Sequence, residues 1–461
     1  LVLIYSYVAI RILGSAQRLE AVHSVYSLSK WMKLLVSIYI RFKFNNISSI
    51  SAMKSNLYLL ILVSLLNASN ILAQNNLKAQ TVYDLIYEGK LNLAFDKVNK
   101  LDESNEKHYL KGKLFRLMGK YDEAINSYNQ IIKEDNFTDL ANQELIDIYT
   151  HHKIDLGKAK SIISENNYEG FYLANVLISP LSVQSKGRFE IPFDTRTKYH
   201  PYLPSIMGSI NGINSSLYFD TGANYIVMPV SFANTFKIEY DSTYYDFGQQ
   251  GYSTSKIFYS TIDSLYLSKD LLMVNIPVIL LEEMNTELVV FGTNIIKQFI
   301  TTIDYPNNKF ILINDVNLMQ NKNLNEISEK FEMPFYLAGD HYMFGQGILD
   351  EQKVNMFFDT GLVVVGQIDN KIEQSWFAVT DSEIQNFKPD YELLSKSVTD
   401  LITSNITLEF ANHSNINAIF STSGKREFIF ENIKCDILIS HGVLSKYKWT
   451  IDFERMVYLF E

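Results

Sequence analysis

Cysteine is nearly absent from this chain. Its 461 residues include one, Cys435, so no intramolecular disulfide can form. A metal site built from cysteines is excluded for the same reason. The adjacent histidines His151 and His152 lie in a helical-looking stretch, where we find no carboxylate at ligand spacing. We therefore expect no metal and no other cofactor, and a fold that depends on packing alone.

Positive charge is also scarce. The formal net charge is -10 at pH 7, and lysines and arginines form no long run. Nucleic-acid binding needs clustered basic residues, so we exclude nucleic acid as the main partner. Hydrophobic residues make up 47% of the chain and charged residues 20%, which is typical of a globular protein. At roughly 100 to 200 residues per domain, this length predicts two to four domains.

The N-terminal part lacks an apolar run long enough to span a bilayer, which takes roughly 20 residues. From Met53 the chain reads MKSN, LYLLILVSLLNAS and NILA, followed by Gln74. A basic start, a short apolar core and small residues at the end are typical of a secretory signal peptide. We interpret residues 1–52 as a non-native upstream extension and 53–73 as the signal peptide. The alternative is a membrane-anchoring leader.

Either interpretation of the leader predicts export. The lone cysteine suits a bacterial exported protein, so we expect a periplasmic or extracellular location. No stable membrane span is expected once the leader has been removed.

Residues 74–170 have a helical pattern. Small residues at Gly112 and Ala124 would let two helices pack closely, with aromatic residues between them. From Ala94 to Ala124 is 30 positions and from Ala124 to Ala159 is 35. This spacing resembles the tetratricopeptide repeat, which has a period of about 34 residues. The resemblance implies a protein partner bound by the repeats, and the alternative is an unrelated helical bundle.

After the helical region, short β-branched and aromatic runs indicate strands. They form two copies of one plan, which we assign to residues 171–320 and 321–461. Each copy has an early Pro-Phe pair, an apolar strand ending in Asp-Thr-Gly, a later apolar segment with glycine, and a closing Thr-Ile-Asp. The matched landmarks are Pro192 and Pro334, Asp220 and Asp359, Gly292 and Gly442, and Asp304 and Asp452. Four landmarks in the same order indicate an internal duplication.

The paired triplets are Asp220-Thr221-Gly222 and Asp359-Thr360-Gly361. With the apolar motifs that end at Gly292 and Gly442, they make residues 188–461 resemble the pepsin and retropepsin superfamily of aspartic peptidases. The alanine directly after the first triplet, Ala223, is more typical of retropepsin, whereas two lobes fused in one chain are more typical of pepsin. The expected fold is an N-terminal α-helical repeat domain followed by an all-β bilobed acid-protease fold.

The resemblance implies a catalytic pair, Asp220 and Asp359, acting on a peptide or protein substrate in a monomer with fused lobes. Two carboxylates facing one water can share a proton, so that one acts as base and the other as acid. The resemblance also implies that Thr221 and Thr360 hydrogen-bond across the lobe junction. It implies an aromatic residue on a hairpin flap as well, for which Tyr252 is the candidate.

The recurring Asp304 and Asp452 lie far past the triplets, and we interpret them as turn residues. The sequence departs from the family at Leu362, where a small residue is usual after the second triplet. Without a hydroxyl at Ala223 or Leu362, the ionised pair has fewer hydrogen bonds, so we expect a pH optimum nearer neutral than that of pepsin.

Leu362 also leaves open a second function, a peptidase-like protein that binds peptides without cutting them. A third interpretation is a carbohydrate-binding β protein, suggested by the 29 Tyr and 29 Phe residues. Their spacing forms no platform, and core packing accounts for them.

Overall fold

The computed structural model describes most of the chain after residue 76. The described ranges are 77–132, 136–163, 179–248, 254–282, 288–315, 331–368, 370–387, 401–403, 407–410, 413–415, 419–422 and 427–461. The predicted upstream extension and signal peptide lie outside them. Within these ranges, no helix is both long and apolar enough to cross a membrane.

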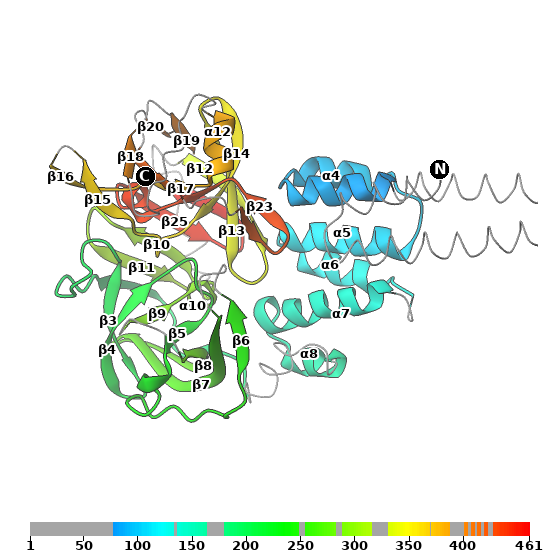
Figure 1. Ribbon diagram of the computed structural model, residues 1–461. Helices are drawn as coiled ribbons and strands as arrows, with labels where there is room; N and C mark the ends of the chain where they lie inside the picture. The colour runs from blue at the N-terminus through cyan, green and yellow to red at the C-terminus, as the bar shows by residue number, and fades with distance from the viewer. Residues whose placement is uncertain are drawn as a thin grey trace, which may run out of the picture. The chain divides into compact units, whose positions relative to one another are not determined.

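The described chain begins with helices (Figure 1). A helix over residues 77–87 is followed by α4 (Leu91–Val98), α5 (Asn105–Leu117), α6 (Tyr121–Tyr128), α7 (Asn136–Asp147), the π-helical η1 (Ile148–His152) and α8 (Leu156–Ile162). The side chain of Ser104 caps α5 by accepting from the Lys107 N–H at 3.2 Å. Gly112 lets α5 and α6 pack closely, because a Cβ there would lie 2.5 Å from the Tyr128 ring. The tetratricopeptide assignment stays a prediction.

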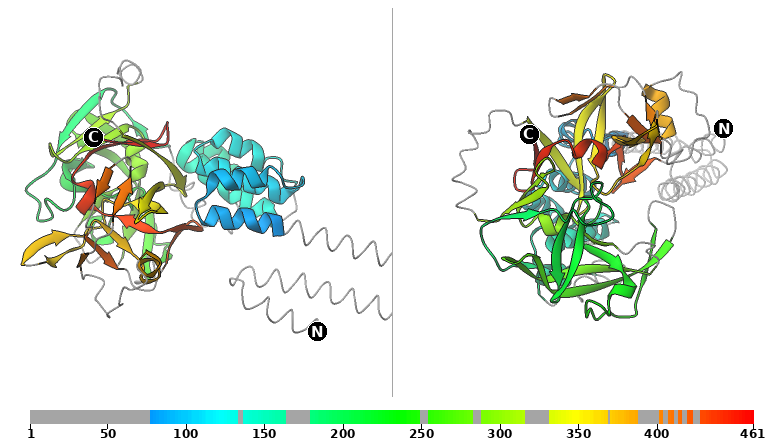
Figure 2. Two further views of the ribbon diagram at one scale, coloured as in Figure 1. Left: turned by 90° about the horizontal axis from the view of Figure 1, so that it is seen from above. Right: turned by 90° about the vertical axis from the view of Figure 1, so that its left-hand side faces the viewer.

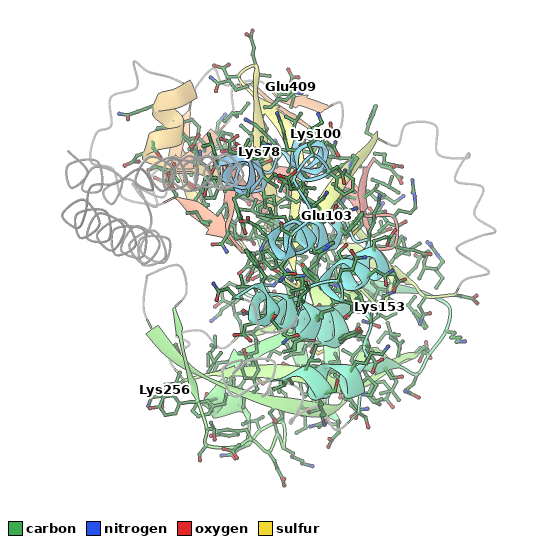
Figure 3. All side chains as sticks on the ribbon, turned by 90° about the vertical axis from the view of Figure 1, so that its right-hand side faces the viewer. Lys78, Lys100, Glu103, Lys153, Lys256 and Glu409 are labelled. Atoms are coloured by element: carbon green, nitrogen blue, oxygen red, sulfur yellow. The ribbon has the colours of Figure 1, made fainter. Side chains whose placement is uncertain are left out.

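The outer surface of these helices is charged. Lys100, Glu103 and Lys153 are exposed there (Figure 3). Glu103 pairs with Lys107 at 2.7 Å, and Lys153 pairs with Asp122 at 2.7 Å. Exposed ion pairs of this kind add about 0 to 1 kcal/mol each, so the helices depend on their buried faces for stability.

The rest of the described chain is mostly β. The first lobe is an eight-stranded sheet in the order β1-β8-β5-β9-β4-β3-β7-β6. Its strands are β1 (Ser182–Val183), β3 (Ser205–Ile210), β4 (Ile213–Phe219), β5 (Ile226–Pro229), β6 (Tyr245–Gly248), β7 (Thr254–Ser268), β8 (Leu271–Leu281) and β9 (Val289–Phe291). The short helices η2 (Val230–Phe232) and α10 (Thr293–Ile296) connect them.

The second lobe repeats the central part of this plan. Its strands are β13 (Tyr342–Leu349), β14 (Gln352–Phe358), β15 (Val365–Ile368), β16 (Lys371–Gln374), β17 (Phe377–Val379), β18 (Leu401–Thr403), β19 (Leu408–Phe410), β20 (His413–Asn415), β21 (Ile419–Thr422), β22 (Phe428–Phe430), β23 (Ile433–Cys435) and β24 (Ile437–Ile439). The helices are α12 (Asp381–Phe387) and α13 (His441–Leu444). In both lobes a hairpin, β3–β4 or β13–β14, leads to a triplet, and its second strand runs parallel to a later one, β9 or β24.

Three strands from each lobe lie side by side between the lobes, as one part of a fourteen-stranded sheet that continues from β12 to β13 and into the second lobe. The order of this shared part is β12-β26-β25-β10-β11-β2, with β2 (Arg188–Pro192), β10 (Ile300–Asp304), β11 (Lys309–Ile313), β12 (Phe331–Ala338), β25 (Lys448–Asp452) and β26 (Val457–Phe460). The closing strands β10 and β25 are antiparallel neighbours with Thr302 opposite Thr450, and the two hydroxyls lie 2.7 Å apart. The two copies therefore meet at equivalent residues.

One large apolar core lies inside the two lobes, and a second apolar cluster joins the helices to the second lobe. Both lobes and the helices can be followed from two further sides in Figure 2. The helical members of the second cluster are Ala79, Val82, Ile86, Leu91, Ala94, Val98, Leu110, Leu114 and Leu117, and its strand members include Tyr336, Phe344, Phe357, Phe430, Ile433 and Leu438. The boundaries predicted between domains stay predictions, but the helices and the second lobe share a continuous core.

Candidate active site

Each Asp-Thr-Gly triplet begins where a buried strand ends. Phe219 ends β4 and Phe358 ends β14, and both side chains are completely buried. The Asp220 N–H donates to the carbonyl of Phe291 at 3.2 Å, and the Asp359 N–H donates to that of Ile439 at 2.8 Å. The apolar motif later in each lobe thus holds the start of that lobe's triplet.

The two threonines tie the triplets to each other. Thr221 Oγ1 donates to the carbonyl of Phe358 at 2.6 Å and accepts from the Thr360 N–H at 2.9 Å. In the reverse direction, Thr360 Oγ1 donates to the carbonyl of Phe219 at 3.2 Å and accepts from the Thr221 N–H at 3.0 Å. Both threonines are fully buried, so these bonds are shielded from water. The structure therefore has the cross-lobe bonds that the resemblance implies.

The two triplet glycines allow the carboxyl groups to approach the opposite loop. A Cβ on Gly361 would lie 2.4 Å from Asp220 Cγ, and one on Gly222 would lie 3.2 Å from Asp359 Oδ1. The Gly222 N–H donates to Asp220 Oδ1 at 2.7 Å, and the Gly361 N–H donates to Asp359 Oδ1 at 2.9 Å. A side chain at either position would enter the space that the carboxyl groups use.

Asp220 and Asp359 bring their carboxyl groups close together, because a Cβ on Gly222 would lie 3.1 Å from Asp220 Oδ1 and 3.2 Å from Asp359 Oδ1. Burial raises the pKa of Asp220, although the Gly222 N–H and the neighbouring Asp359 carboxyl lower it in part. Burial and then the charge of Asp220 raise the pKa of Asp359 well above its usual range. Two neighbouring carboxyl groups with raised pKa values can hold one proton between them at pH values where a solvated carboxyl is ionised.

Leu362 is accommodated without loss of the second loop's hydrogen bonds. Its main-chain N–H donates to Asp359 Oδ1 at 3.1 Å, whereas the Ala223 N–H bonds to the main-chain oxygen of Asp220 at 3.2 Å. The leucine side chain is partly buried and packs against the cluster shared with the helices. The main chain at Leu362 thus supplies the Asp359 carboxylate with a hydrogen bond, although the leucine side chain has no hydroxyl.

The other residues singled out from the sequence lie away from the carboxyl pair or outside the described ranges. Strands β6 and β7 form a hairpin with Gly248 opposite Thr254. The flap candidate Tyr252 lies outside the described residues. Asp304 accepts from the Asn307 N–H at 3.2 Å, and Asp452 accepts from the Arg455 N–H at 3.0 Å. Both aspartates are turn residues of closing hairpins, as predicted.

A buried polar cluster beside the first triplet was missed in the sequence. Its centre is Asp340, in the turn between β12 and β13. Oδ2 of Asp340 accepts from Asn294 at 2.8 Å and from Asn224 at 3.3 Å, and its main-chain oxygen accepts from Lys297 at 2.7 Å. Burial opposes the charge of Asp340, but His341, His151 and Lys297 hold its pKa well below the usual range. The cluster joins the turn of the second lobe to the loops of the first.

The expectation about the histidine pair was wrong in one respect, because a carboxylate does stand at helical spacing. Asp147 precedes His151 by four residues, and the Nε2 atom of His151 lies 3.5 Å from Asp147 Oδ1. Asp340, from the second lobe, lies 3.7 Å from the Nδ1 atom of the same ring. Among the residues that the structure describes, no group of three His, Cys, Asp or Glu side chains is placed to hold a metal ion.

Two comparisons give similarities to aspartic peptidases. Residues 206–298 match the family of gag-polyprotein putative aspartyl proteases, a match that covers the first triplet and the motif ending at Gly292. Among solved structures, the chain is similar to a retropepsin-like aspartic protease from Rickettsia conorii, at 18% identity over 29% of this chain and 94% of that one, with a TM-score of 0.21. No curated protein matches the chain. The family match lies within the first lobe, from β3 to just past α10.

Proposed function

We propose that this chain is an exported aspartic endopeptidase that hydrolyses peptide bonds with a water activated by Asp220 and Asp359. The observation that carries the proposal is the close pair of carboxyl groups, Asp220 and Asp359, at the ends of two equivalent strands. Two neighbouring acidic groups, each with a pKa that burial raises, can hold one proton between them.

The reaction needs one carboxyl group of the pair ionised and the other protonated at the same time. The ionised carboxylate removes a proton from the attacking water, and the protonated carboxyl gives its proton to the reacting amide. The C–N bond then breaks, the nitrogen leaves as an amine, and the new acid keeps the water oxygen. The cross-lobe threonine bonds and the triplet N–H groups keep the two carboxyl groups at fixed separation.

The substrate in this proposal is a peptide or protein. Both triplets belong to one chain, so a monomer holds the complete pair. The segment 53–73 is proposed as the signal for export to the periplasm or beyond, and the helices are proposed to bind a protein partner through their surface. The charged outer residues Lys100, Glu103 and Lys153 are accessible to such a partner.

A peptide-cleavage assay tests the proposal. The chain from residue 74 onward is incubated with a peptide library, with and without pepstatin, and products are identified by mass spectrometry. We expect cleavage that pepstatin inhibits and that Asp220→Asn and Asp359→Asn abolish. Cleavage that survives both substitutions would mean that another group performs the reaction.

The second candidate is a protein that binds peptides without cutting them. Leu362 is the feature that favours it, although the second loop keeps its hydrogen bonds in spite of the leucine. Measurable peptide binding by the wild type with no product at any pH would favour this candidate.

A further inference from the structure

The helices support the strand that carries the second triplet. Along β14, Met356 and Phe358 belong to the core of the lobes, while Phe357 between them belongs to the cluster shared with the helices. On the same side, Asn355 Nδ2 donates to the main-chain oxygen of Glu88 at 2.7 Å. The strand that leads to Asp359 is therefore held between the lobe core and the helical region.

In the part of the chain that the structure describes, the apolar contact between the helices and the first lobe lies away from β4, where Leu156 of α8 packs against Ile257 and Tyr259 of β7. Tyr218 of β4 occupies the position that Phe357 has in β14, two residues before the catalytic candidate. Tyr218 lines a surface hollow of about 440 Å³ together with Tyr199 and Phe232. The segment after the first triplet is instead linked to the helices through a polar contact.

That contact is made by His151, on the π-helical turn η1. The Nδ1 atom of His151 lies 2.6 Å from the hydroxyl of Tyr225 and 3.7 Å from Asp340 Oδ2. Tyr225 follows the first triplet by three residues and precedes β5 directly. His151 is 8% exposed, so water competes weakly for these contacts.

The helical side of the contact is itself fixed by charges. Asp147, which faces Nε2 of His151, is paired with Arg116, and Arg116 also pairs with Glu144 at 2.5 Å. On the peptidase side, Asp340 accepts from Asn224, whose own side-chain oxygen accepts from the Tyr225 N–H at 2.8 Å. His151 thus joins two networks of side chains that are already held in place.

We propose that the helical region is an integral part of the peptidase, and that His151 is a positioning residue that holds the loop after Asp220 through Tyr225 and Asp340. This inference rests on the proposed function for its effect on catalysis. Its structural part, the fixing of residues 220–226, can be measured without any activity.

The matched variants are His151→Asn and His151→Gln. An asparagine amide takes the place of Nδ1 and can keep the bond to Tyr225, whereas a glutamine amide takes the place of Nε2 and loses it. We expect His151→Gln to lower kcat by roughly 10- to 100-fold with KM nearly unchanged, since small misplacements of reacting groups have effects of that size. His151→Asn should remain within about threefold of the wild type. Tyr225→Phe removes the same bond from the other side and should reproduce the loss.

Amide hydrogen exchange gives the second readout. We expect faster exchange over residues 217–229 in His151→Gln and Tyr225→Phe than in the wild type and His151→Asn, with equal Tm for the two His151 variants. Equal exchange and equal kcat in both His151 variants would overturn the positioning role. If no form cleaves peptides but the exchange difference is present, the proposed function fails and the positioning role holds.

Discussion

Removal of one threonine hydroxyl should weaken the junction between the lobes by a large and calculable amount. In Thr221→Val, the buried carbonyl of Phe358 loses a donor at 2.6 Å and the buried N–H of Thr360 loses an acceptor at 2.9 Å. Each buried group left without a partner costs about 1 to 3 kcal/mol. The expected loss is therefore about 2 to 6 kcal/mol, a large part of the roughly 5 to 15 kcal/mol that holds a typical protein folded.

Urea unfolding measures this loss, with Thr221→Ser as the matched control. Serine keeps the hydroxyl and lacks only a methyl group, which is worth about 1 kcal/mol. We expect the midpoint for Thr221→Val to fall well below that for Thr221→Ser, with the same slope for both. Unfolding free energies for the two variants that agree within about 1 kcal/mol would refute the reasoning, because the hydroxyl would then contribute almost nothing to stability.

Three further predictions concern the glycines, an ion pair and the pH dependence. Gly361→Ala should abolish peptide cleavage because its Cβ would meet Asp220 Cγ at 2.4 Å, while Gly222→Ala, with a nearest contact of 3.1 Å, should keep part of the activity; equal kcat values would contradict this. Burial opposes the charge of Glu144, but Arg116 and Lys113 lower its pKa from 4.5 to about 2. The ionised Glu144 therefore stabilises the fold fully above pH 4.5, and this contribution of about 3 kcal/mol is lost as the pH falls toward 2. Urea unfolding at pH 5 and 2.5 should show a smaller drop in unfolding free energy for Glu144→Gln than for the wild type. An equal drop in both proteins would exclude this role. Since the pKa values of both carboxyl groups of the pair are raised, the pH-rate profile should peak above the ordinary aspartate pKa of 3.8, and a peak below about pH 3 would contradict the raised values.

The duplicated plan of the β region was predictable because its landmarks are local. An apolar strand followed by Asp-Thr-Gly can be recognised from neighbouring residues alone. The Thr-Ile-Asp segments that end at Asp304 and Asp452 were correctly predicted to lie in closing strands. Their pairing with each other, with Thr302 opposite Thr450, follows from the two copies being equivalent. The sequence also predicted helices before the β region, whose family stays a prediction.

The polar cluster around Asp340 was not predictable because its members are far apart in the chain. Asp340 and His151 are separated by 189 positions, and no local pattern distinguishes either from an ordinary turn or helix residue. The one usable signal was the i, i+4 spacing of Asp147 and His151. The hairpin β15–β16 was equally hard to predict, because the first lobe has no equivalent segment. From Asp359 to Phe377, where β17 begins, is 18 positions, whereas from Asp220 to Ile226, where β5 begins, is 6.

The central claim is that Asp220 and Asp359 act as one catalytic unit. The most direct test is kcat/KM for a cleaved peptide, measured with the wild type, Asp220→Asn, Asp359→Asn and the double variant. We expect each single substitution to remove nearly all activity and the double substitution to remove no more, because groups that act as a unit are not additive. Losses that multiply in the double variant, or a single variant that keeps wild-type activity, would contradict the claim.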